Sequence, residues 1–516
     1  MSRSDPATSP CRPLRASLAA LALCALAGCA SLPDARQIDS RVERFELLQQ
    51  RVCAPQPSEA ALRAAVGDGD LAFVHKLARI EAALARRPLL AGNQVTLLKD
   101  GPSTHDAQLG AIAKARHHVH LDIYLLTADE LGERYAQALI ERRRAGVDVR
   151  VIVDGIGGMG AGEAFRARLR EAGVELREFN TVNLLKDPRL WRITRRSHRK
   201  VLVVDGQVAF TGGINITDDY TSGSGPSSGA GAGSGLGSGV GSGLGAGSGL
   251  GSGSGSGLGS SGRGAPGWRD THIRIDGPAV AEFQRLFLDY WKDLGDAAPE
   301  HDAFFPPLRE QGDQLVRTVT DQGQDLLDQL LAPAGSLMRT LSGRPPKMEA
   351  AIYGTYLAAI QHARRRVWIT QAYFAPNDEF IATLEAAARR GVDVRLLMPG
   401  ETDVKVLMYA ARHHYQRLLD AGIRLYEYQD TVLHAKTAVV DGVWATVGSA
   451  NLDYRSFIHN DEANAIVIGR RFGTQMERMF EDDLKTAHEI TPAEWRRRPT
   501  SDRIKETMAA AIKFAL

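Results

Sequence analysis

Short apolar runs alternate with amphipathic stretches along the chain from about residue 93 onward. The runs VRVIVD at 149–154 and VRLLMP at 394–399 are apolar and contain β-branched residues, as buried strands do. The stretch before each run has the periodicity of an amphipathic helix. Alternation of this kind predicts β-α-β units around a mostly buried sheet, and therefore an α/β fold.

The pattern occurs twice in the chain. ARHHVHLDIYLL at 115–126 is followed by a helix-like stretch and AGVDVRVIVDG at 145–155; ARRRVWITQAYF at 363–374 is likewise followed by RGVDVRLLMPG at 390–400. Internal similarity at this scale indicates duplication. We therefore expect two duplicated lobes, each a mixed β-sheet flanked by helices, with any shared site at the pseudo-twofold interface.

Composition shifts divide the chain into six expected parts. These are a signal at 1–28, an anchor and helical approach segment at 29–92, a first lobe at 93–300, a connector at 301–346, a second lobe at 347–490 and a helical tail at 491–516. A Gly/Ser-rich insertion at 221–267 interrupts the first lobe, and its composition predicts a flexible coil. The tail places Ile504, Met508, Ile512 and Leu516 on one helical face, for packing or for a membrane surface.

The N-terminus has the features of an export signal. Arginines precede an apolar run that is too short to span a bilayer, and the run ends in Leu26-Ala27-Gly28-Cys29. This end resembles the lipobox of bacterial lipoproteins, which implies cleavage before Cys29 and lipidation of its sulfur. The alternative is a plain secretory signal. No other segment is apolar enough to cross a membrane, and Cys53 is left without a disulfide partner.

The strongest chemical signal is a paired motif. Five residues recur with identical spacing in the two halves: His198, Lys200, Asp205, Gly212 and Asn215, then His434, Lys436, Asp441, Gly448 and Asn451. On a strand, His and Lys at positions i and i+2 face the same way. The Asp-Gly pair then predicts a turn, in which Asp205 and Asp441 have a mainly structural role.

Each half also supplies a carboxylate at an equivalent place. Asp270 stands seven residues before Gly277, and Glu462 stands seven residues before Gly469. We expect these two acids to hold the histidine ring nitrogens opposite the reacting ones. The spacing leaves open whether each acid serves the histidine of its own half or of the other half.

Two such sets suit a phosphodiester. Lys200 and Lys436 would supply positive charge, and Asn215 and Asn451 would supply donors, to the nonbridging phosphate oxygens. One histidine can attack phosphorus while the other protonates the departing alcohol and then deprotonates the incoming one. The lysines disfavour a metal at this site, because an ammonium group cannot ligate.

The motif resembles the phospholipase D superfamily, whose mark is HxKx4D followed by a glycine-rich turn and Asn. HRKVLVVDGQVAFTGGIN, TVGSANLDYRSF and EITPAEWRRRP are most similar to bacterial cardiolipin synthases, which differ in having transmembrane helices in place of a lipobox. The resemblance implies transfer of a phosphatidyl group from one phosphatidylglycerol to another, with release of glycerol and without metal or cofactor. It also implies that His198 is the nucleophile and His434 the acid/base.

Several alternatives stay open. The same chemistry with water as acceptor gives a phospholipase D. A nuclease of the superfamily is disfavoured because 63 Lys and Arg balance 61 Asp and Glu, so that no nucleic-acid partner is expected. A non-catalytic lipid-binding lipoprotein is disfavoured by two intact motifs.

The expected partners are phospholipids, with phosphatidylglycerol favoured, and the membrane that holds the lipidated Cys29. One chain carries both motifs, so a monomer suffices for a complete site. We expect a lipid-anchored protein of the bacterial envelope, and Ala30 is compatible with sorting to the outer membrane facing the periplasm. Tyr373, Phe374 and Trp444 are candidates to line a path for acyl chains, and His117, His118 and His120 are a weaker candidate metal site.

Overall fold

The computed structural model describes residues 57–181, 195–222, 267–295, 304–305, 335–343 and 351–512. The expected signal, Cys29 and nearly all of the Gly/Ser insertion lie outside the described residues. Within the described ranges, no helix combines the length and the apolar character that crossing a bilayer requires.

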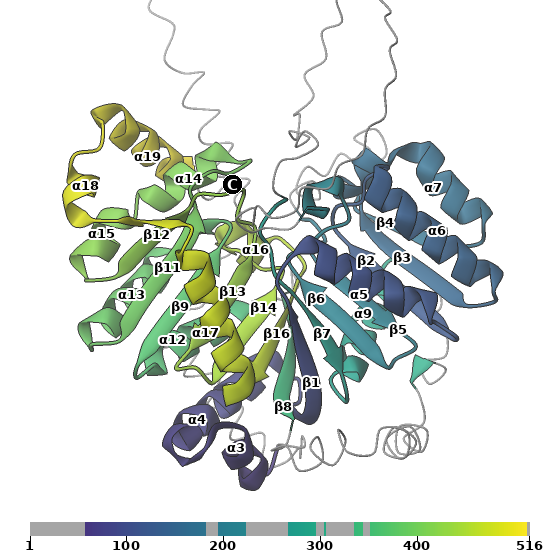
Figure 1. The fold of residues 1–516 in the computed structure, drawn as a ribbon, viewed down its shortest axis with the longest axis horizontal. Coiled ribbons are helices and arrows are strands. Elements are labelled where there is room, and N and C mark those ends of the chain that lie inside the picture. The colour runs from purple at the N-terminus through teal and green to yellow at the C-terminus, as the bar shows by residue number, and fades with distance from the viewer. Residues whose placement is uncertain are drawn as a thin grey trace, which may run out of the picture.

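The strands of the two halves form one sheet that is symmetric about its centre (Figure 1). From the centre outward, the first half supplies β1 (Leu90–Leu98), β7 (His272–Asp276), β6 (Val208–Gly212), β5 (Lys200–Val204), β2 (His118–Ile123), β3 (Asp148–Asp154) and β4 (Glu175–Phe179). The second half supplies, in the matching order, β8 (Ser336–Gly343), β16 (Glu462–Ile468), β14 (Trp444–Gly448), β13 (Lys436–Val440), β9 (Arg366–Gln371), β11 (Asp393–Pro399) and β12 (Arg424–Tyr428). An edge strand, β17 (Ala487–Ile490), pairs with β12. The expected duplicated α/β fold is confirmed.

Strand direction is also the same in both halves. The outer three strands, β2-β3-β4 and β9-β11-β12, run parallel, while the inner strands pair antiparallel. The central strands β1 and β8 pair antiparallel and join the two halves into a single sheet. Since β8 corresponds to β1, the expected connector at 301–346 contains the first strand of the second half.

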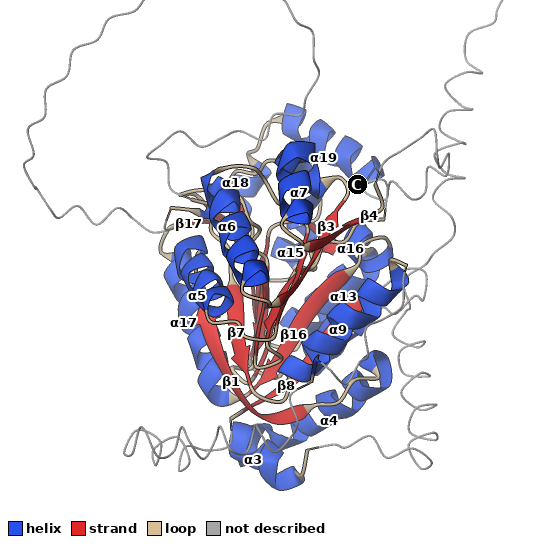
Figure 2. Ribbon diagram, turned by 90° about the vertical axis from the view of Figure 1, so that its right-hand side faces the viewer, coloured by secondary structure: helices blue, strands red, loops and turns tan. Residues whose placement is uncertain are grey.

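Helices cover both faces of the sheet (Figure 2). Over the first half these are α5 (Gly101–Ala113), α6 (Glu130–Arg144) and α7 (Gly162–Glu171), and over the second half α12 (Ala351–His362), α13 (Asp378–Arg389), α14 (Lys405–Arg412) and α15 (Tyr415–Asp420). The equivalent helices α9 (Val280–Asp293) and α17 (Arg470–Leu484) share one apolar core that draws residues from both halves. Shorter elements are the 3-10 turns η1 (Gly157–Ala161) and η2 (Asp218–Tyr220), β10 (Phe374–Ala375), β15 (Leu452–Asp453), α16 (Tyr454–Ile458) and α18 (Pro492–Arg496), followed by the terminal α19 (Thr500–Ile512).

The approach segment is helical, as its periodicity predicts, and packs on the second half. It forms α3 (Glu59–Val66) and α4 (Asp68–Ala85), which lie at the bottom of Figure 1. Glu81 of α4 is buried and accepts a hydrogen bond of 2.7 Å from the indole of Trp444. Trp444 therefore belongs to the core beneath α4, which corrects its expected place along an acyl-chain path.

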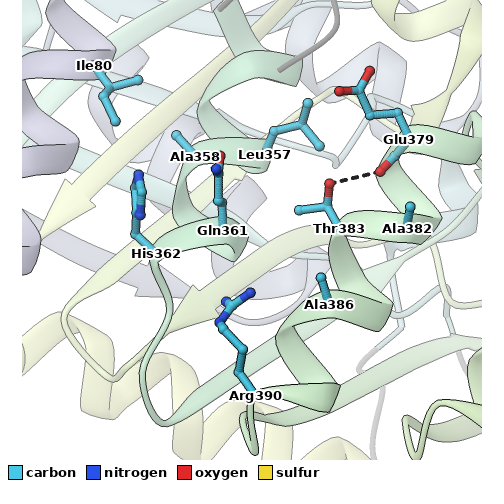
Figure 3. A pocket seen from close by; sticks show the side chains of 10 residues that line it. All are labelled: Ile80, Leu357, Ala358, Gln361, His362, Glu379, Ala382, Thr383, Ala386 and Arg390. Carbon is cyan, nitrogen blue, oxygen red and sulfur yellow. Dashed lines mark hydrogen bonds between the residues drawn. The ribbon is translucent and has the colours of Figure 1, made fainter. Parts of the chain in front are cut away.

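A groove of about 380 Å³ lies between the outer helices of the second half. Ile80 of α4, His362 of α12 and Arg390, the residue that follows α13, are among the side chains that line it (Figure 3). None of the paired-motif residues lines this groove. The candidate chemistry lies elsewhere, where the two halves meet.

The histidine run before the first motif serves packing. On β2, His118 Nε2 lies 2.9 Å from Gln284 Oε1, and the Gln284 amide nitrogen lies 2.7 Å from His120 Nδ1. Burial lowers the pKa of His118 to about 4 and holds the pKa of His120 well below its usual value, so both imidazoles are neutral at neutral pH. Across the described ranges, no three His, Cys, Asp or Glu residues group closely enough to hold a metal ion.

Candidate active site

Each motif folds as a hairpin whose turn is set by its aspartate. The turn after β5 has positive φ at Asp205 (53°) and Gly206 (64°), which are the backbone angles of a tight hairpin turn. The Asp205 carboxylate accepts hydrogen bonds from the backbone amides of His117 and His118, at 2.8 and 2.9 Å. These contacts anchor the hairpin to the start of β2.

The second hairpin repeats the arrangement. Asp441 has the same φ of 53°, and its carboxylate accepts from the backbone amides of Arg364, Arg365 and Arg366 at the start of β9. The contacts of both aspartates are thus to backbone amides, which supports a structural role for them.

The two histidines lie just before the strands rather than on them, since β5 and β13 begin at the lysines. The backbone amide of His198 donates to the carbonyl of Asp461 at 2.9 Å, and the amide of His434 donates to the carbonyl of Arg269 at 2.7 Å. Each motif histidine is therefore held by the backbone of the other half. This exchange brings the two motifs together at the pseudo-twofold interface.

The carboxylates cross between the halves in the same way. His198 Nδ1 lies 3.0 Å from Glu462 Oε2, and His434 Nδ1 lies 2.7 Å from Asp270 Oδ2. Both acids are completely buried. Since the carboxylates occupy both Nδ1 atoms, the Nε2 atoms are the ones left to react, and each acid serves the histidine of the other half.

Both carboxylates are ionised despite their burial. Burial acts to raise the pKa of Glu462, but its contact with His198 and the charge of Lys200 hold it below its usual value. Burial likewise acts to raise the pKa of Asp270, and Lys436 and His434 hold it below its usual value. Ionised acids fix the proton of each imidazole on Nδ1 and orient the rings.

One small residue beside each acid differs between the halves. Ser449 donates a 2.5 Å hydrogen bond to Glu462 Oε2. The equivalent residue is Gly213, where a Cβ atom would stand 2.2 Å from Asp270 Oδ1. Glycine is needed at 213 because Asp270 comes so close, whereas serine at 449 gives Glu462 an additional donor.

The environments of the two imidazoles also differ. The hydroxyl of Tyr220 lies 2.9 Å from His434 Nδ1, and the ring of Trp268 lies 5.5 Å from that of His434. His198 instead has the ring of Tyr124 at 5.0 Å. Sequence reasoning missed Tyr220 because it immediately precedes the insertion, where the two halves cease to correspond.

Burial weakens the proton affinity of both lysines, and the charge of Lys436 adds to this for Lys200. Burial lowers the pKa of Lys200 to about 7, with a further contribution from Lys436, and burial lowers the pKa of Lys436 to about 8. The Lys200 ammonium donates to the His198 carbonyl at 2.8 Å, and Lys436 makes the same contact with His434. An anion between the two ammonium groups would relieve their repulsion, so the site favours a phosphate.

The motif asparagines complete the polar surface. The side-chain oxygen of Asn215 accepts from the amide of Leu125 at 3.2 Å, and the Asn215 side chain also hydrogen-bonds Tyr220, the neighbour of His434. Asn451 is 4% exposed, and its side-chain oxygen has no hydrogen-bond partner in the described part of the chain. The sequence-predicted site residues that the structure describes are thus brought together, apart from Asp205 and Asp441 at the far ends of the hairpins.

The two ends of the Gly/Ser insertion meet beside His434. The amide of Trp268 donates to the carbonyl of Asp219 at 2.9 Å, and a Cβ atom on Gly267 would lie 2.3 Å from the Ser222 carbonyl oxygen. The chain therefore leaves and re-enters the lobe at one point. The backbone on either side of the insertion is held in place without it.

Deleting residues 224–264 should leave activity within about tenfold of the full chain. The two ends of the insertion already contact each other, and the entropy lost on closing a loop grows only logarithmically with its length. Turnover and melting temperature of the deletion protein check this. A larger loss of turnover at an unchanged melting temperature would instead assign the insertion a role in covering the site.

Comparison with known proteins agrees with this geometry. The family model described as "Cardiolipin synthase, PLD-like domain" matches residues 109–224 and 356–484, one match in each half. A cardiolipin synthase of Geobacillus kaustophilus is 33% identical over 438 residues, which cover 84% of this chain and 75% of that protein. Cardiolipin synthase 1 of Bacillus cereus is 30% identical over 416 residues, 81% of this chain and 71% of its own length.

A solved structure shares the fold. The crystal structure of phosphatidylserine synthase from Haemophilus influenzae superposes with a TM-score of 0.57, covering 86% of this chain and all of that one, at 13% sequence identity. At this identity the likeness concerns the arrangement of helices and strands alone.

Proposed function

The chain belongs to the cardiolipin synthase family of phospholipase D-like proteins, and from this we propose that it transfers a phosphatidyl group between phospholipids, with two phosphatidylglycerols as substrates and cardiolipin and glycerol as products. The observation that carries the proposal is the crossed pair of buried histidine-carboxylate contacts, His198 with Glu462 and His434 with Asp270, beside two lysines. This set provides a nucleophile, a proton donor and an anion site in one chain.

In the first step, Nε2 of His198 attacks phosphorus of the first phosphatidylglycerol. The bond from phosphorus to the glycerol headgroup oxygen breaks, and that oxygen takes a proton from His434. Burial lowers the pKa of His198 to about 4, although Glu462 acts against this, so the imidazole is unprotonated and nucleophilic at neutral pH. The products of this step are free glycerol and a phosphatidyl group on His198.

In the second step, His434 acts as the base. It removes the proton from a headgroup hydroxyl of a second phosphatidylglycerol, and that oxygen attacks phosphorus and displaces Nε2 of His198. Lys200, Lys436 and the two motif asparagines hold the nonbridging oxygens throughout. Over the two steps, one phosphodiester P–O bond is broken and another is formed, so the reaction needs no energy from a nucleotide.

A place at the envelope membrane follows from the sequence signal. We propose that lipidation of Cys29 tethers the enzyme to the membrane that supplies its substrates. Ala30 is compatible with sorting of the lipidated protein to the outer membrane facing the periplasm. A monomer suffices for catalysis, because both halves of the site come from one chain.

The pH dependence of kcat/KM should reflect His198, His434 and the lysines. The rate should rise through about pH 4 as His198 loses its proton. It should fall toward higher pH as His434, whose pKa burial holds below its usual value, loses the proton that it donates in the first step, and above about pH 7 as Lys200 loses the charge that binds phosphate. The alkaline limb of kcat should lie at higher pH, since bound phosphodiester raises the lysine pKa. Lys200→Arg is the matched variant, because its guanidinium stays charged and should move the alkaline limb of kcat/KM upward. An alkaline limb that stays in place would assign it to another group.

The proposal is tested in a bacterial host that lacks cardiolipin. Expression of the full chain should restore cardiolipin in the extracted lipids, as measured by mass spectrometry, while the His198→Ala chain should not. Accumulation of phosphatidic acid in place of cardiolipin would instead favour the phospholipase D alternative.

A further inference from the structure

Large apolar side chains exposed to solvent are confined to one end of the molecule. Across the described ranges they are Met159, Ile504 and Met508, which are 64%, 57% and 66% exposed. Met159 lies in η1, directly before α7, and the other two lie on α19. In Figure 1 and Figure 2, α7 and α19 both lie at the top, at the end opposite α3.

In the first half, this exposed residue is adjacent to the environment of His198. The turn η1 packs so closely on Tyr124 that a Cβ atom on Gly157 would lie 2.1 Å from the Tyr124 carbonyl oxygen. The Tyr124 ring contacts the His198 ring at 5.0 Å. Met159 is thus two residues away from Gly157, which packs on Tyr124, and Tyr124 in turn contacts His198, the proposed nucleophile.

In the second half, an equivalent chain of contacts leads to His434. Ala509, next to Met508, is buried with Leu407 and Ala410 of α14, and Tyr373 packs against the same cluster. The Tyr373 ring lies 6.0 Å from the His434 ring. The exposed apolar residues therefore flank the site from both halves, each through one aromatic side chain.

Positive charge accompanies the apolar residues on α19. Ile504 stands between Arg503 and Lys505, both exposed, of which Lys505 pairs with Asp502 at 3.0 Å. Arg496 and Arg497 are exposed at the end of α18 and carry further positive charge. Apolar side chains rimmed by basic ones are typical of helices that lie at an anionic membrane surface.

We propose that Met159, Ile504 and Met508 form a docking face that seats the mouth of the site on an anionic phospholipid bilayer. The inference rests on the proposed function, because a phosphodiester whose acyl chains stay in the bilayer reaches the paired histidines only if the mouth faces that surface. Anchors on both sides of the site fix this orientation, which a single lipid group on Cys29 does not. A lipid surface is favoured over a second copy of the chain because the face combines cations with anchors from both lobes.

Hydrogen exchange of the full chain locates the contact independently of catalysis. Adding phosphatidylglycerol vesicles should slow exchange in peptides that cover 157–161 and 501–511, while α3 exchanges unchanged. Unchanged exchange in both peptides would overturn the proposal. If exchange in these two peptides slows when the protein concentration is raised without vesicles, the face mediates self-association. That result would also overturn the proposal.

A charge variant connects the face to turnover. Ile504→Asp combined with Met508→Asp should lower turnover of phosphatidylglycerol in vesicles by tenfold or more, yet leave turnover of monomeric dihexanoyl-phosphatidylglycerol within twofold. The control is Ala64→Asp, which adds a charge to the exposed surface of α3 at the opposite end. Equal loss on both substrates, or no loss on vesicles, contradicts the proposal. If the unmodified chain turns over neither lipid, the proposed function fails while hydrogen exchange still decides the docking face.

Discussion

Replacing His198 by alanine should abolish the covalent intermediate, whereas the His434→Ala protein should form it and retain it. With a substrate whose leaving group is nitrophenolate, the first step needs no proton donor, so His198 alone determines whether phosphorus becomes bound to the enzyme. With the natural substrate, either change should lower turnover by about 10⁴-fold or more, because both groups act in both steps. Mass spectrometry of the intact, alkali-quenched protein detects the adduct, because the P–N bond of a phosphohistidine survives in alkali and is hydrolysed in acid.

The control for this experiment is His118→Gln, which alters a buried histidine that lies on β2 and contacts Gln284 outside the site. It should retain adduct formation and turnover if folding is intact. An adduct on the histidine of the second motif in the His198→Ala protein would reverse the assignment of roles.

Neutralising a carboxylate should impair the histidine of the opposite half. Glu462→Gln should slow formation of the adduct, because Glu462 holds the ring of His198. Asp270→Asn should slow its breakdown, because Asp270 holds the ring of His434. Losses of about 10²-fold or more are expected for groups that orient a reacting imidazole. Rapid-quench measurement of the nitrophenolate burst and of the steady rate separates the two steps.

A matched control removes a buried carboxylate that has no contact with either histidine. Glu427 is 6% exposed and pairs with Arg412. Glu427→Gln should lower the melting temperature. It should not slow adduct formation, seen in the nitrophenolate burst, or adduct breakdown, seen in the steady rate, selectively. The crossed arrangement is contradicted if Glu462→Gln impairs breakdown alone and Asp270→Asn impairs formation alone.

Much of the site was predictable because duplication makes its residues visible twice. The equal spacing of His198, Lys200 and Asp205 with their counterparts identified the paired motif, and the acids were found from their distance to Gly277 and Gly469. Strand periodicity also predicted the mixed sheet. These features depend on residues that are close together in the sequence, so a spacing or a periodicity is enough to predict them.

What the sequence left open depends on long-range packing. The partner of each acid is set by backbone exchange between the halves, seen in the contacts of His198 with Asp461 and of His434 with Arg269. Tyr220 approaches His434 over 214 positions of sequence. Trp444 and Glu81 are 363 positions apart in the sequence, yet the Trp444 indole donates to the Glu81 carboxylate in the core beneath α4. No periodicity reports contacts of this kind.

The choice between a lipid acceptor and water is the central claim, and product analysis tests it most directly. Water competes for the phosphatidyl group on His198 at its bulk concentration, so a transferase must hold the acceptor hydroxyl beside His434 and exclude water, an effect worth several kcal/mol. The full-length enzyme is incubated with phosphatidylglycerol vesicles at saturating lipid, and cardiolipin, glycerol and phosphatidic acid are quantified. We predict that cardiolipin and glycerol form in equal amounts and exceed phosphatidic acid, whereas a predominance of phosphatidic acid would show that the enzyme is a phospholipase.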